Sequence, residues 1–324
     1  MSGSAILDAP SVVLADVDPV LRLLPRALPP GWTELPWELH DLVWTPGEGC
    51  RLVVRLRPAD GPSRFVAVDV SADGWSRRDY REDPGLPGLA RAADPGEVAS
   101  LLADRLDGPV RRCRVEAVRY RSGSRCVLRY DARTRTAWTS VYAKVLTPER
   151  FGEAARIQRT LTGPGEDGPA LVPALVSVWS EQQTLVGEAI PGRTVSSLLV
   201  APAEPVTRRL RLAHDLGGLL ARFHGQDVTA RGGSSIDQLA SLTALLPAAR
   251  LCDPVTADRV AGLLDLLASR APATSTEVLG HGGFRAGQVI WSPHRGVVLL
   301  DTDGARRCDQ GRDLGSATCS TSGR

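Results

Sequence analysis

The change of hydrophobic pattern near Pro191-Gly192 constrains the fold more than any other feature of the sequence. Before it, short alternating runs are broken by Gly and Pro, which predicts β-hairpins. After it, the stretch VTRRLRLAHDLGGLLARFHGQ has apolar residues at the spacing of an amphipathic helix. These residues are Leu212, Leu216, Leu219, Leu220 and Phe223. A β-rich half followed by a helical half predicts the α+β fold class.

The order of elements in the β-rich half occurs twice. Residues 39–71 contain three strand-like runs, and a loop rich in Arg, Asp, Gly and Pro separates them from the helical stretch DPGEVASLLADRL. Residues 113–146 again contain three such runs, followed by the helical stretch TPERFGEAARIQRTL. A shift of 76 positions places Gly47 on Gly123, Cys50 on Cys126 and Ala67 on Ala143. We interpret this pattern as a degenerate duplication.

Other stretches predict the remaining elements. A short helix is expected near residues 17–24, and a hairpin over residues 175–192. Two more helices are expected over residues 235–250 and 254–271. The stretch QVIWSPHRGVVLLDTDG predicts two short strands around a turn, and the polar end GSATCSTSGR looks unlike a helix.

Composition excludes several classes of function. The net charge is +2 without a basic tract, so nucleic acid is not an expected partner. The N-terminus lacks the basic start of a secretory signal, and no apolar run reaches the roughly 20 residues that span a bilayer. The six cysteines show no C-x-x-C pair, which favours reduced thiols over zinc ligands or disulfides. We therefore expect a cytoplasmic protein without a membrane partner.

Lys144 is the only lysine in the chain. The other 38 of the 39 lysine and arginine residues are arginine (39 minus one). In such a chain a merely solvated charge would be expected to be arginine. Lysine offers a compact point charge that reaches phosphate oxygens. The alternative is a solvent-facing charge at a strand end. Glu153, in the helix that follows, is the predicted partner of the ammonium group, and Glu149 on the same helix is its rival.

Two turns add candidate contacts to phosphate and metal. In the hairpin loop YRSGSRC, backbone N–H groups of Gly123 and Ser124 could cover phosphates, although the same composition describes an ordinary turn. Asp301 and Asp303 follow the buried run GVVLL. Carboxylates in this position suit Mg²⁺ beside a triphosphate, and the alternative is a pair of turn-forming aspartates.

Together these pieces resemble the aminoglycoside phosphotransferase and choline kinase family, relatives of the protein kinases. The stretch HGGFRAGQ, from His281 to Gln288, is similar in spacing to the family's catalytic loop H-G-D-x-x-x-x-N. VVLLDTDG is similar to its metal motif, and RDLG, with Asp313, to its later D-L-A. LLARFH and GEAIPG look like its helix and interlobe segments. The resemblance covers about residues 113–315.

The resemblance implies a bilobal protein-kinase-like fold with a β-rich N-lobe and a helical C-lobe. We expect the N-lobe at residues 111–192 and the C-lobe, with the catalytic and metal loops, at residues 193–324. Residues 1–110 are expected to form an additional β-rich region with helix, the degenerate repeat. Only 23 residues follow Asp301 (324 minus 301), so we expect an incomplete C-lobe from a truncated or frame-shifted reading frame.

The resemblance also implies roles for individual residues, with two departures from the family. The implied catalytic positions are His281 and Gly283, the nucleotide contacts are Lys144, Glu153, Gly123 and Ser124, and the metal ligands are Gln288 and Asp301. Gly283 stands where the family has its catalytic aspartate. Gln288 replaces asparagine, and its carbonyl oxygen can still coordinate Mg²⁺ one methylene further out. Asp303 is the predicted substitute base, because it alternates onto the same strand face as Asp301.

Three functional hypotheses follow. The favoured one is a kinase that transfers the γ-phosphate of ATP, or GTP, with Mg²⁺ to a hydroxyl of a small molecule. Loss of a general base weakens such a reaction by about 10²- to 10⁴-fold without abolishing it, because positioning and metal electrostatics supply most of the catalysis. The second is a pseudokinase that binds a nucleotide or ligand without phosphotransfer, and the third is a non-binding remnant. Lys144 and Asp301 favour the first two, and Gly283 separates them.

Overall fold

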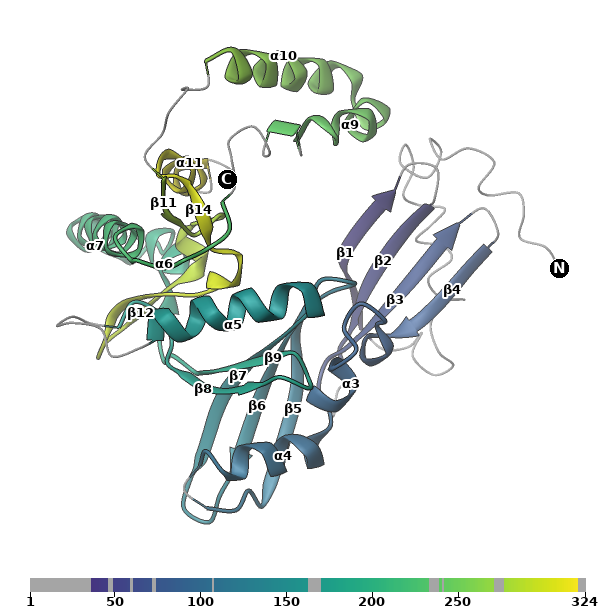
Figure 1. The fold of residues 1–324 in the computed structure, drawn as a ribbon, viewed down its shortest axis with the longest axis vertical. Helices are drawn as coiled ribbons and strands as arrows, with labels where there is room; N and C mark the ends of the chain where they lie inside the picture. Colours follow the sequence, from purple (N-terminus) through teal and green to yellow (C-terminus); the bar gives the residue numbers. More distant parts are fainter. Residues whose placement is uncertain are drawn as a thin grey trace. The chain divides into compact units, whose positions relative to one another are not determined.

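In the computed structural model the chain forms two compact units. Figure 1 labels the helices and strands that they contain. Unit 1 comprises Met1–Pro148, Trp179–Val186 and Thr243–Asp265, and unit 2 comprises Glu149–Val178, Gly187–Leu242 and Leu266–Arg324. The structure describes residues 36–45, 49–58, 61–71, 74–106, 108–162, 170–232, 239–240, 242–270 and 277–319. The predicted helix near residues 17–24 lies outside the described residues.

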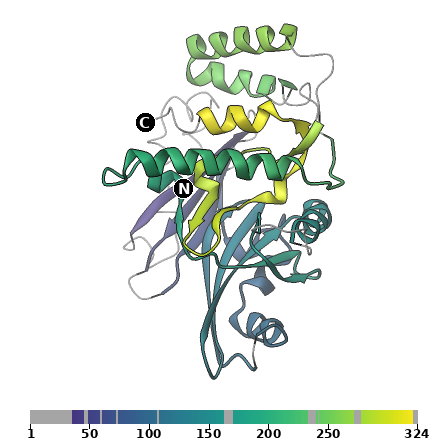
Figure 2. The ribbon, with the colours of Figure 1, turned by 90° about the vertical axis from the view of Figure 1, so that its left-hand side faces the viewer.

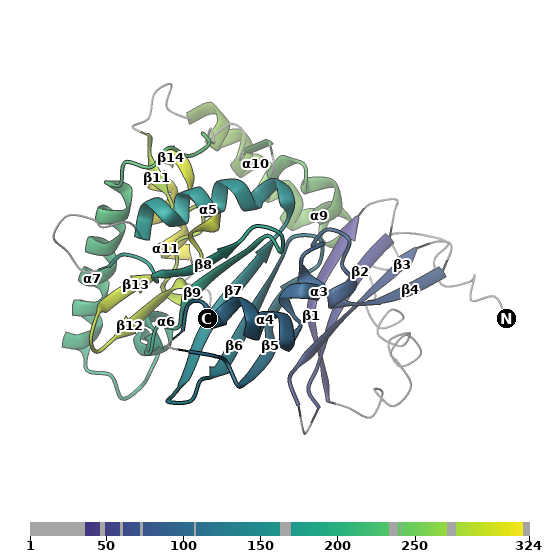
Figure 3. The ribbon, with the colours of Figure 1, turned by 60° about the horizontal axis from the view of Figure 1, so that its bottom comes forward.

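The first sheet of unit 1 is antiparallel, in the order β1-β2-β3-β4 (Figure 3). Its strands are β1 (Trp37–Thr45), β2 (Gly49–Leu56), β3 (Arg64–Ser71) and β4 (Gly74–Asp79). The first three were predicted. The prediction of a loop directly after residue 71 was wrong, because residues 74–79 pair with β3 from Ser71↔Gly74 to Val66↔Asp79. Ladder hydrogen bonds to a neighbouring strand outweigh the polar composition of this segment.

Short helices connect this sheet to the second one. They are the 3₁₀ turn η1 (Tyr80–Glu82), α3 (Leu89–Ala92) and α4 (Pro95–Ala103). The predicted start of α4 is confirmed, because Asp94 accepts a hydrogen bond from the backbone N–H of Glu97 and proline occupies the first turn. α4 packs against β5 and β6 of the second sheet.

The second sheet has the order β5-β6-β7-β9-β8. Its strands are β5 (Arg112–Arg121), β6 (Arg125–Arg133), β7 (Trp138–Leu146), β8 (Leu175–Trp179) and β9 (Thr184–Glu188). All five were predicted as strands. On β6 the burial alternates strictly, so Cys126 and Tyr130 lie on a buried face while Val127 and Arg129 lie on a half-exposed one.

Unit 2 contains most of the remaining elements. The helices outside the first β-rich region are α5 (Pro148–Thr162), α6 (Val195–Leu199), α7 (Val206–His224), α9 (Leu246–Cys252), α10 (Pro254–Arg270) and α11 (Gly311–Cys319). The remaining strands are β10 (Arg193–Thr194), β11 (Glu277–Gly280), β12 (Val289–Ser292), β13 (Gly296–Leu299) and β14 (Arg306–Asp309). The fold class is therefore α+β, as predicted. Of the helix expected over residues 235–250, the part before residue 242 lies mostly outside the described residues.

The core of unit 2 forms where α7 packs against β11 and β13 (Figure 2). The predicted apolar stripe of α7 is confirmed at four of its five positions, since Leu212, Leu219, Leu220 and Phe223 are buried and Leu216 is half-buried. They pack with Leu279, Val289 and Leu299 of the three strands around the candidate site. Burial of such side chains contributes about 1.5–3 kcal/mol each, so α7 is the scaffold of this part of the chain.

The prediction that the polar end is not helical was wrong for residues 315–319, because Gly311–Cys319 forms α11, and residues 320–324 lie outside the described residues. The N–H of Gly311 donates to the Asp309 carboxylate at 2.7 Å, and Asp313 lies in the first turn. Both carboxylates favour a helix start, although few apolar residues mark it. Among the described residues, no helix has the length and apolar character needed to cross a membrane.

Candidate functional site

A buried carboxylate organises the loop that follows β11. The side chain of Asp313, in α11, is 0% exposed and accepts three hydrogen bonds. The donors are the backbone N–H of His281 at 2.7 Å, the backbone N–H of Gly282 at 2.9 Å and Nε2 of His224 at 3.1 Å. Gly282 has φ +82°, a conformation that favours glycine. The Asp313 carboxylate therefore holds the turn formed by residues 281–283, here called the HGG turn, against the end of α7.

The hydrogen bonds also keep Asp313 charged. Burial by itself raises the pKa of the Asp313 carboxyl group. The hydrogen bonds from His224 and from the backbone of His281 and Gly282 outweigh burial and lower that pKa below its ordinary value. A charged acceptor makes each of these hydrogen bonds stronger than a neutral one would.

His281 is buried, with 3% of its surface exposed. Its Nε2 lies 2.8 Å from the carbonyl oxygen of Leu300, and because a carbonyl only accepts, Nε2–H is the donor. The ring lies edge-on to Phe223 and Phe284, with centroids 6.0 and 6.2 Å away. His281 thus ties the HGG turn to the end of β13. His281 was predicted as a catalytic residue, and its contacts in this structure position the loop.

Gln288 and Asp301, the two predicted metal ligands, lie side by side. Nε2 of Gln288, in the 3₁₀ turn η2 (Ala286–Gln288), donates to Oδ2 of Asp301 at 2.7 Å. The backbone N–H of Leu300 donates to the Gln288 carbonyl at 2.8 Å, which fixes the two segments together. Asp301 has φ +66° and ψ +37°, a left-handed conformation that aspartate tolerates better than most residues.

The donor chemistry of this pair fits a hard divalent cation. Mg²⁺ prefers oxygen ligands and usually combines one or two protein groups with substrate phosphates and water. Asp301 offers a carboxylate, and Oε1 of Gln288 is buried without a hydrogen-bond partner in the described part of the chain. Oε1 faces away from Asp301 in this arrangement, so the amide would have to turn over to present it to a shared cation. No group of three or more His, Cys, Asp or Glu among the described residues could hold a metal by itself.

Asp303 does not continue a strand, so the prediction that it shares a strand face with Asp301 was wrong. β13 ends at Leu299, and Thr302–Gly304 form the 3₁₀ turn η3. The Asp303 side chain is 4% exposed, and its Oδ2 lies 3.1 Å from Nη2 of Arg150. Thr302 donates to Oε1 of Gln158 at 2.8 Å, which also fixes the turn. A buried carboxylate paired with a guanidinium group is poorly placed to accept a proton from a substrate.

Gly283 has room for a side chain. A Cβ atom built on Gly283 meets no atom within 4 Å, whereas one on Gly282 would lie 3.1 Å from the carbonyl oxygen of Gly304. The two glycines therefore have different roles. Gly282 is required by its backbone conformation and by its close neighbour, and Gly283 leaves open space where the family has its aspartate.

Lys144 and Glu153 belong to different units, and their pairing stays a prediction. Lys144 lies on β7 opposite Val127, on the half-exposed face of the second sheet. In unit 2, the Glu153 carboxylate accepts the backbone N–H of Arg231 at 2.9 Å and lies 3.2 Å from Nε of the same residue. Arg156 lies 3.8 Å from Glu153. Glu153 thus already has cationic partners in its own unit.

Gly123 and Ser124 form the turn between β5 and β6, as the hairpin prediction required. Gly123 has φ +68°, and its N–H donates to Oδ2 of Asp83 at 2.7 Å. The N–H of Ser124 donates to the carbonyl of Arg121 at 3.0 Å. In this structure the predicted phosphate-covering donors are thus engaged within the chain.

Sequence reasoning missed two residues that shape the site. His224, at the end of the predicted amphipathic helix, was not among the candidate site residues, yet it contacts Asp313, 89 positions away. Arg150 was not singled out, yet it pairs with Asp303, 153 positions away. Position at the end of an amphipathic helix is the only sequence signal for His224, and spacing alone gives none for Arg150.

Comparisons with known proteins bear on the same segment. A family model described as the phosphotransferase enzyme family matches residues 146–322. No curated protein matches.

Solved structures show a weaker likeness. A macrolide 2′-phosphotransferase from Brachybacterium faecium is 20% identical, with 67% of this chain and 74% of that chain covered and a TM-score of 0.46. Choline kinase from Streptococcus pneumoniae is 15% identical, with 70% and 74% covered and a TM-score of 0.48. A spectinomycin phosphotransferase in complex with ADP and spectinomycin is 14% identical, with 68% and 72% covered and a TM-score of 0.47.

Proposed function

The chain belongs to the phosphotransferase enzyme family, and from this premise we propose that it transfers the γ-phosphate of ATP or GTP to a hydroxyl group of a small molecule. The observation that carries the proposal is the hydrogen-bonded pair of Gln288 and Asp301 beside the HGG turn. This pair brings together an amide and a carboxylate from two parts of the sequence, and both side chains carry oxygen atoms of the kind that Mg²⁺ prefers as ligands.

Each residue named in this proposal has one task. Asp301, with Gln288 after its amide turns over, would hold Mg²⁺, which when bound would neutralise charge on the phosphates. Lys144 contacts phosphate oxygens as a point charge. His281 and Asp313 keep the HGG turn in place through the contacts described above. The acceptor hydroxyl forms the new P–O bond as the γ-phosphate separates from the nucleoside diphosphate, and the hydroxyl proton passes to water because position 283 has no base.

A pseudokinase is the second candidate, and Gly283 favours it. The only nearby carboxylate proposed as a substitute base, Asp303, pairs with Arg150 and is almost fully buried. Under this hypothesis the nucleotide binds and the phosphate stays in place. Binding and transfer therefore have to be measured separately.

Nucleotide binding should depend on Lys144. We expect saturating Mg²⁺-ATP to stabilise the wild-type protein by about 2.7 kcal/mol when ATP exceeds its Kd a hundredfold. Lys144→Ala should weaken ATP binding about 10- to 100-fold, because it removes a charged hydrogen bond worth about 1.5–3 kcal/mol. Calorimetric titration and thermal unfolding with ATP measure both effects.

Arg129→Ala is the matched control for Lys144→Ala. Arg129 lies on the same half-exposed face of the neighbouring strand, so its removal takes away one positive charge without removing the lysine. Equal losses of affinity in the two variants would contradict a specific phosphate contact by Lys144. Absence of ATP binding in the wild type would remove both candidate functions.

Gln288 should set the Mg²⁺ requirement. We expect Gln288→Leu to raise the Mg²⁺ concentration needed for ATP-dependent stabilisation about tenfold or more, because one oxygen ligand is lost. The control is Gln158→Leu, which removes an amide that contacts the adjacent Thr302. An unchanged Mg²⁺ dependence in Gln288→Leu, with the thermal shift intact, would exclude Gln288 as a metal ligand.

A further inference from the structure

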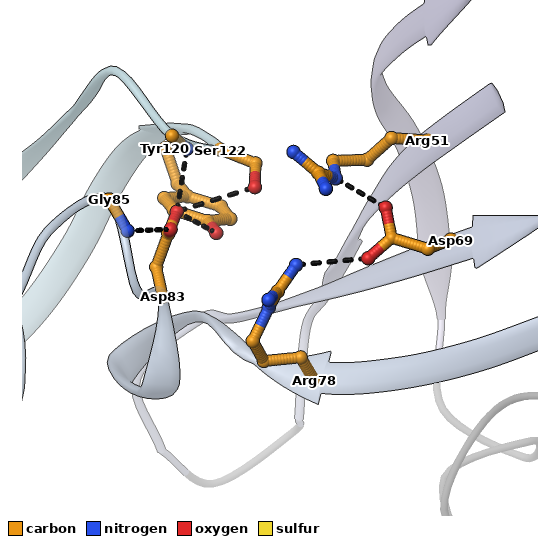
Figure 4. Close-up of polar contacts among 8 residues, drawn as sticks. Arg51, Asp69, Arg78, Asp83, Gly85, Tyr120 and Ser122 are labelled. Atoms are coloured by element: carbon orange, nitrogen blue, oxygen red, sulfur yellow. Dashed lines mark hydrogen bonds and ion pairs between the residues drawn. The ribbon is translucent and has the colours of Figure 1, made fainter. Parts of the chain in front are cut away.

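Asp83 is a buried carboxylate that no step of the proposed function uses. It is 3% exposed and accepts four hydrogen bonds in unit 1. Three of them come from the strand end and turn between β5 and β6, and one from its own segment. Figure 4 shows how Tyr120, Ser122 and Gly85 lie around the carboxylate. The donors are the Tyr120 hydroxyl at 2.6 Å, the Gly123 N–H at 2.7 Å, the Gly85 N–H at 2.9 Å and the Ser122 hydroxyl at 3.3 Å. This is the arrangement of an occupied anion site.

Asp83 belongs to the first β region, defined here as the described residues between 36 and 106. Asp83 follows η1, and the ring of Tyr80 packs against Phe65 and Tyr120 at centroid distances of 6.3 and 6.0 Å. Gly85 lies so close to the turn that an added Cβ would be 2.8 Å from the Cα of Gly123. The close approach therefore requires glycine and brings the two segments together as one packed structure.

The charges around Asp83 suit an ionised carboxylate. Asp69 forms ion pairs with Arg51 at 2.5 Å and with Arg78 at 2.9 Å, close to the turn (Figure 4). Burial raises the pKa of Asp83, but the hydrogen bonds from Tyr120, Gly123 and Gly85, with the charge of Arg78, lower it overall. The group remains charged at neutral pH, so its hydrogen bonds are charge-assisted.

Asp83 reaches the turn from the face of the sheet opposite to Lys144. Tyr120 pairs with Cys126, and both are buried. Lys144 pairs with Val127, the next residue along β6, and both are half-exposed. Because successive residues of a strand point to opposite faces, Asp83 contacts a hydroxyl on one face while Lys144 extends from the other. The Gly123 N–H is thus directed away from the lysine.

We propose that the Asp83 carboxylate, by binding the Gly123 N–H, holds the Gly123 turn away from Lys144. This contact, here called the latch, would let the first β region lower the affinity of the protein for a nucleotide's phosphates. This proposal rests on the proposed function, because it concerns how nucleotide binding by the proposed kinase is regulated. Glycine at position 123 adopts positive or negative φ, so the turn can reverse once the carboxylate is removed. The N–H of Gly123 then becomes available to a phosphate on the Lys144 face.

The test compares two anions and two carboxylate variants. We expect Asp83→Ala and the milder Asp83→Asn to bind Mg²⁺-ATP about tenfold or more tightly than the wild type, because the freed N–H of Gly123 donates to a charged phosphate oxygen. Inorganic pyrophosphate should show the same gain, and adenosine none. Asp69→Asn is the matched control, since Asp69 carries the same charge in the same cluster but does not contact the turn. The affinity of Asp69→Asn for ATP should differ less from the wild-type value than the affinity of Asp83→Asn does.

The outcomes separate the latch from the proposed function. Tighter pyrophosphate binding in the Asp83 variants, without ATP binding in any variant, would support the latch and contradict the kinase. Unchanged affinities in a folded Asp83→Asn, or an equal gain in Asp69→Asn, would overturn the latch. If both Asp83 variants unfold, amide hydrogen exchange of Gly123 in the wild type decides. Slow exchange that ATP leaves unchanged supports the latch, and fast exchange, or exchange that ATP slows, overturns it.

Discussion

Gly283→Asp is expected to raise the rate of phosphoryl transfer about 10²- to 10⁴-fold, the usual contribution of a positioned general base. The backbone should accept the new side chain, because a Cβ at this position meets no atom within 4 Å. The HGG turn that would carry it is already held by Asp313 and His281. Single-turnover transfer from labelled ATP to amino-alcohol and amino-sugar acceptors, and to water, measures the effect.

Gly283→Asn is the control for this substitution, since it has nearly the same size and cannot act as a base. A rate increase in Gly283→Asp alone identifies a site that is complete except for its base. Similar rates in both variants would contradict that conclusion, as would ATP binding without transfer in Gly283→Asp. Thermal unfolding should change little in either variant, because the position is open.

Asp313→Ala should cause the largest loss of stability among these substitutions. The three donors that Asp313 satisfies would lose their acceptor, two of them backbone N–H groups of the HGG turn. Each unsatisfied buried group costs about 1–3 kcal/mol, so we expect a loss of about 3 kcal/mol or more. For a domain of this size that corresponds to a fall in Tm of about 6–12 °C. Calorimetric or spectroscopic thermal unfolding measures it.

Asp309→Ala serves as the control, because it removes a carboxylate that caps the same helix from a half-exposed position. A lost cap costs about 0.5–2 kcal/mol, less than the loss expected for Asp313→Ala. Equal losses in the two variants would show that Asp313 acts only as part of the helix start.

The pH dependence of Asp313 has a definite sign. Its pKa is lowered in the folded state, so its stabilising contribution is complete above the unfolded-state value of about 3.9 and is lost as the pH falls below that value. The difference in Tm between the wild type and Asp313→Asn should therefore be constant near neutral pH and shrink below about pH 4. A difference that shrinks as the pH rises instead would contradict this assignment.

Local patterns predicted much of the fold. The helix starts at Asp94-Pro95 and Pro148, the hairpin at Gly123 and the stripe of α7 are all confirmed. Among the helices and strands, the predictions that were wrong concern β4 and α11, two polar segments, and the strand face predicted for Asp303 was also wrong. β4 depends on its partner β3, and α11 begins at carboxylates whose roles appear only in three dimensions. Periodicity detects an apolar face, and neither segment has a strong one.

The sequence by itself determined most of the order of elements, the α+β class and the two segments that supply Gln288 and Asp301, because these depend on residue type and on short spacings. Only the tertiary structure decided which carboxylates form hydrogen bonds or ion pairs with other parts of the chain. Asp313 holds the HGG turn, Asp303 pairs with Arg150, and Asp83 occupies the Gly123 turn. Each of these contacts joins residues at least 31 positions apart. Such contacts form only when packing brings distant segments together, and the sequence pattern carries no record of that distance.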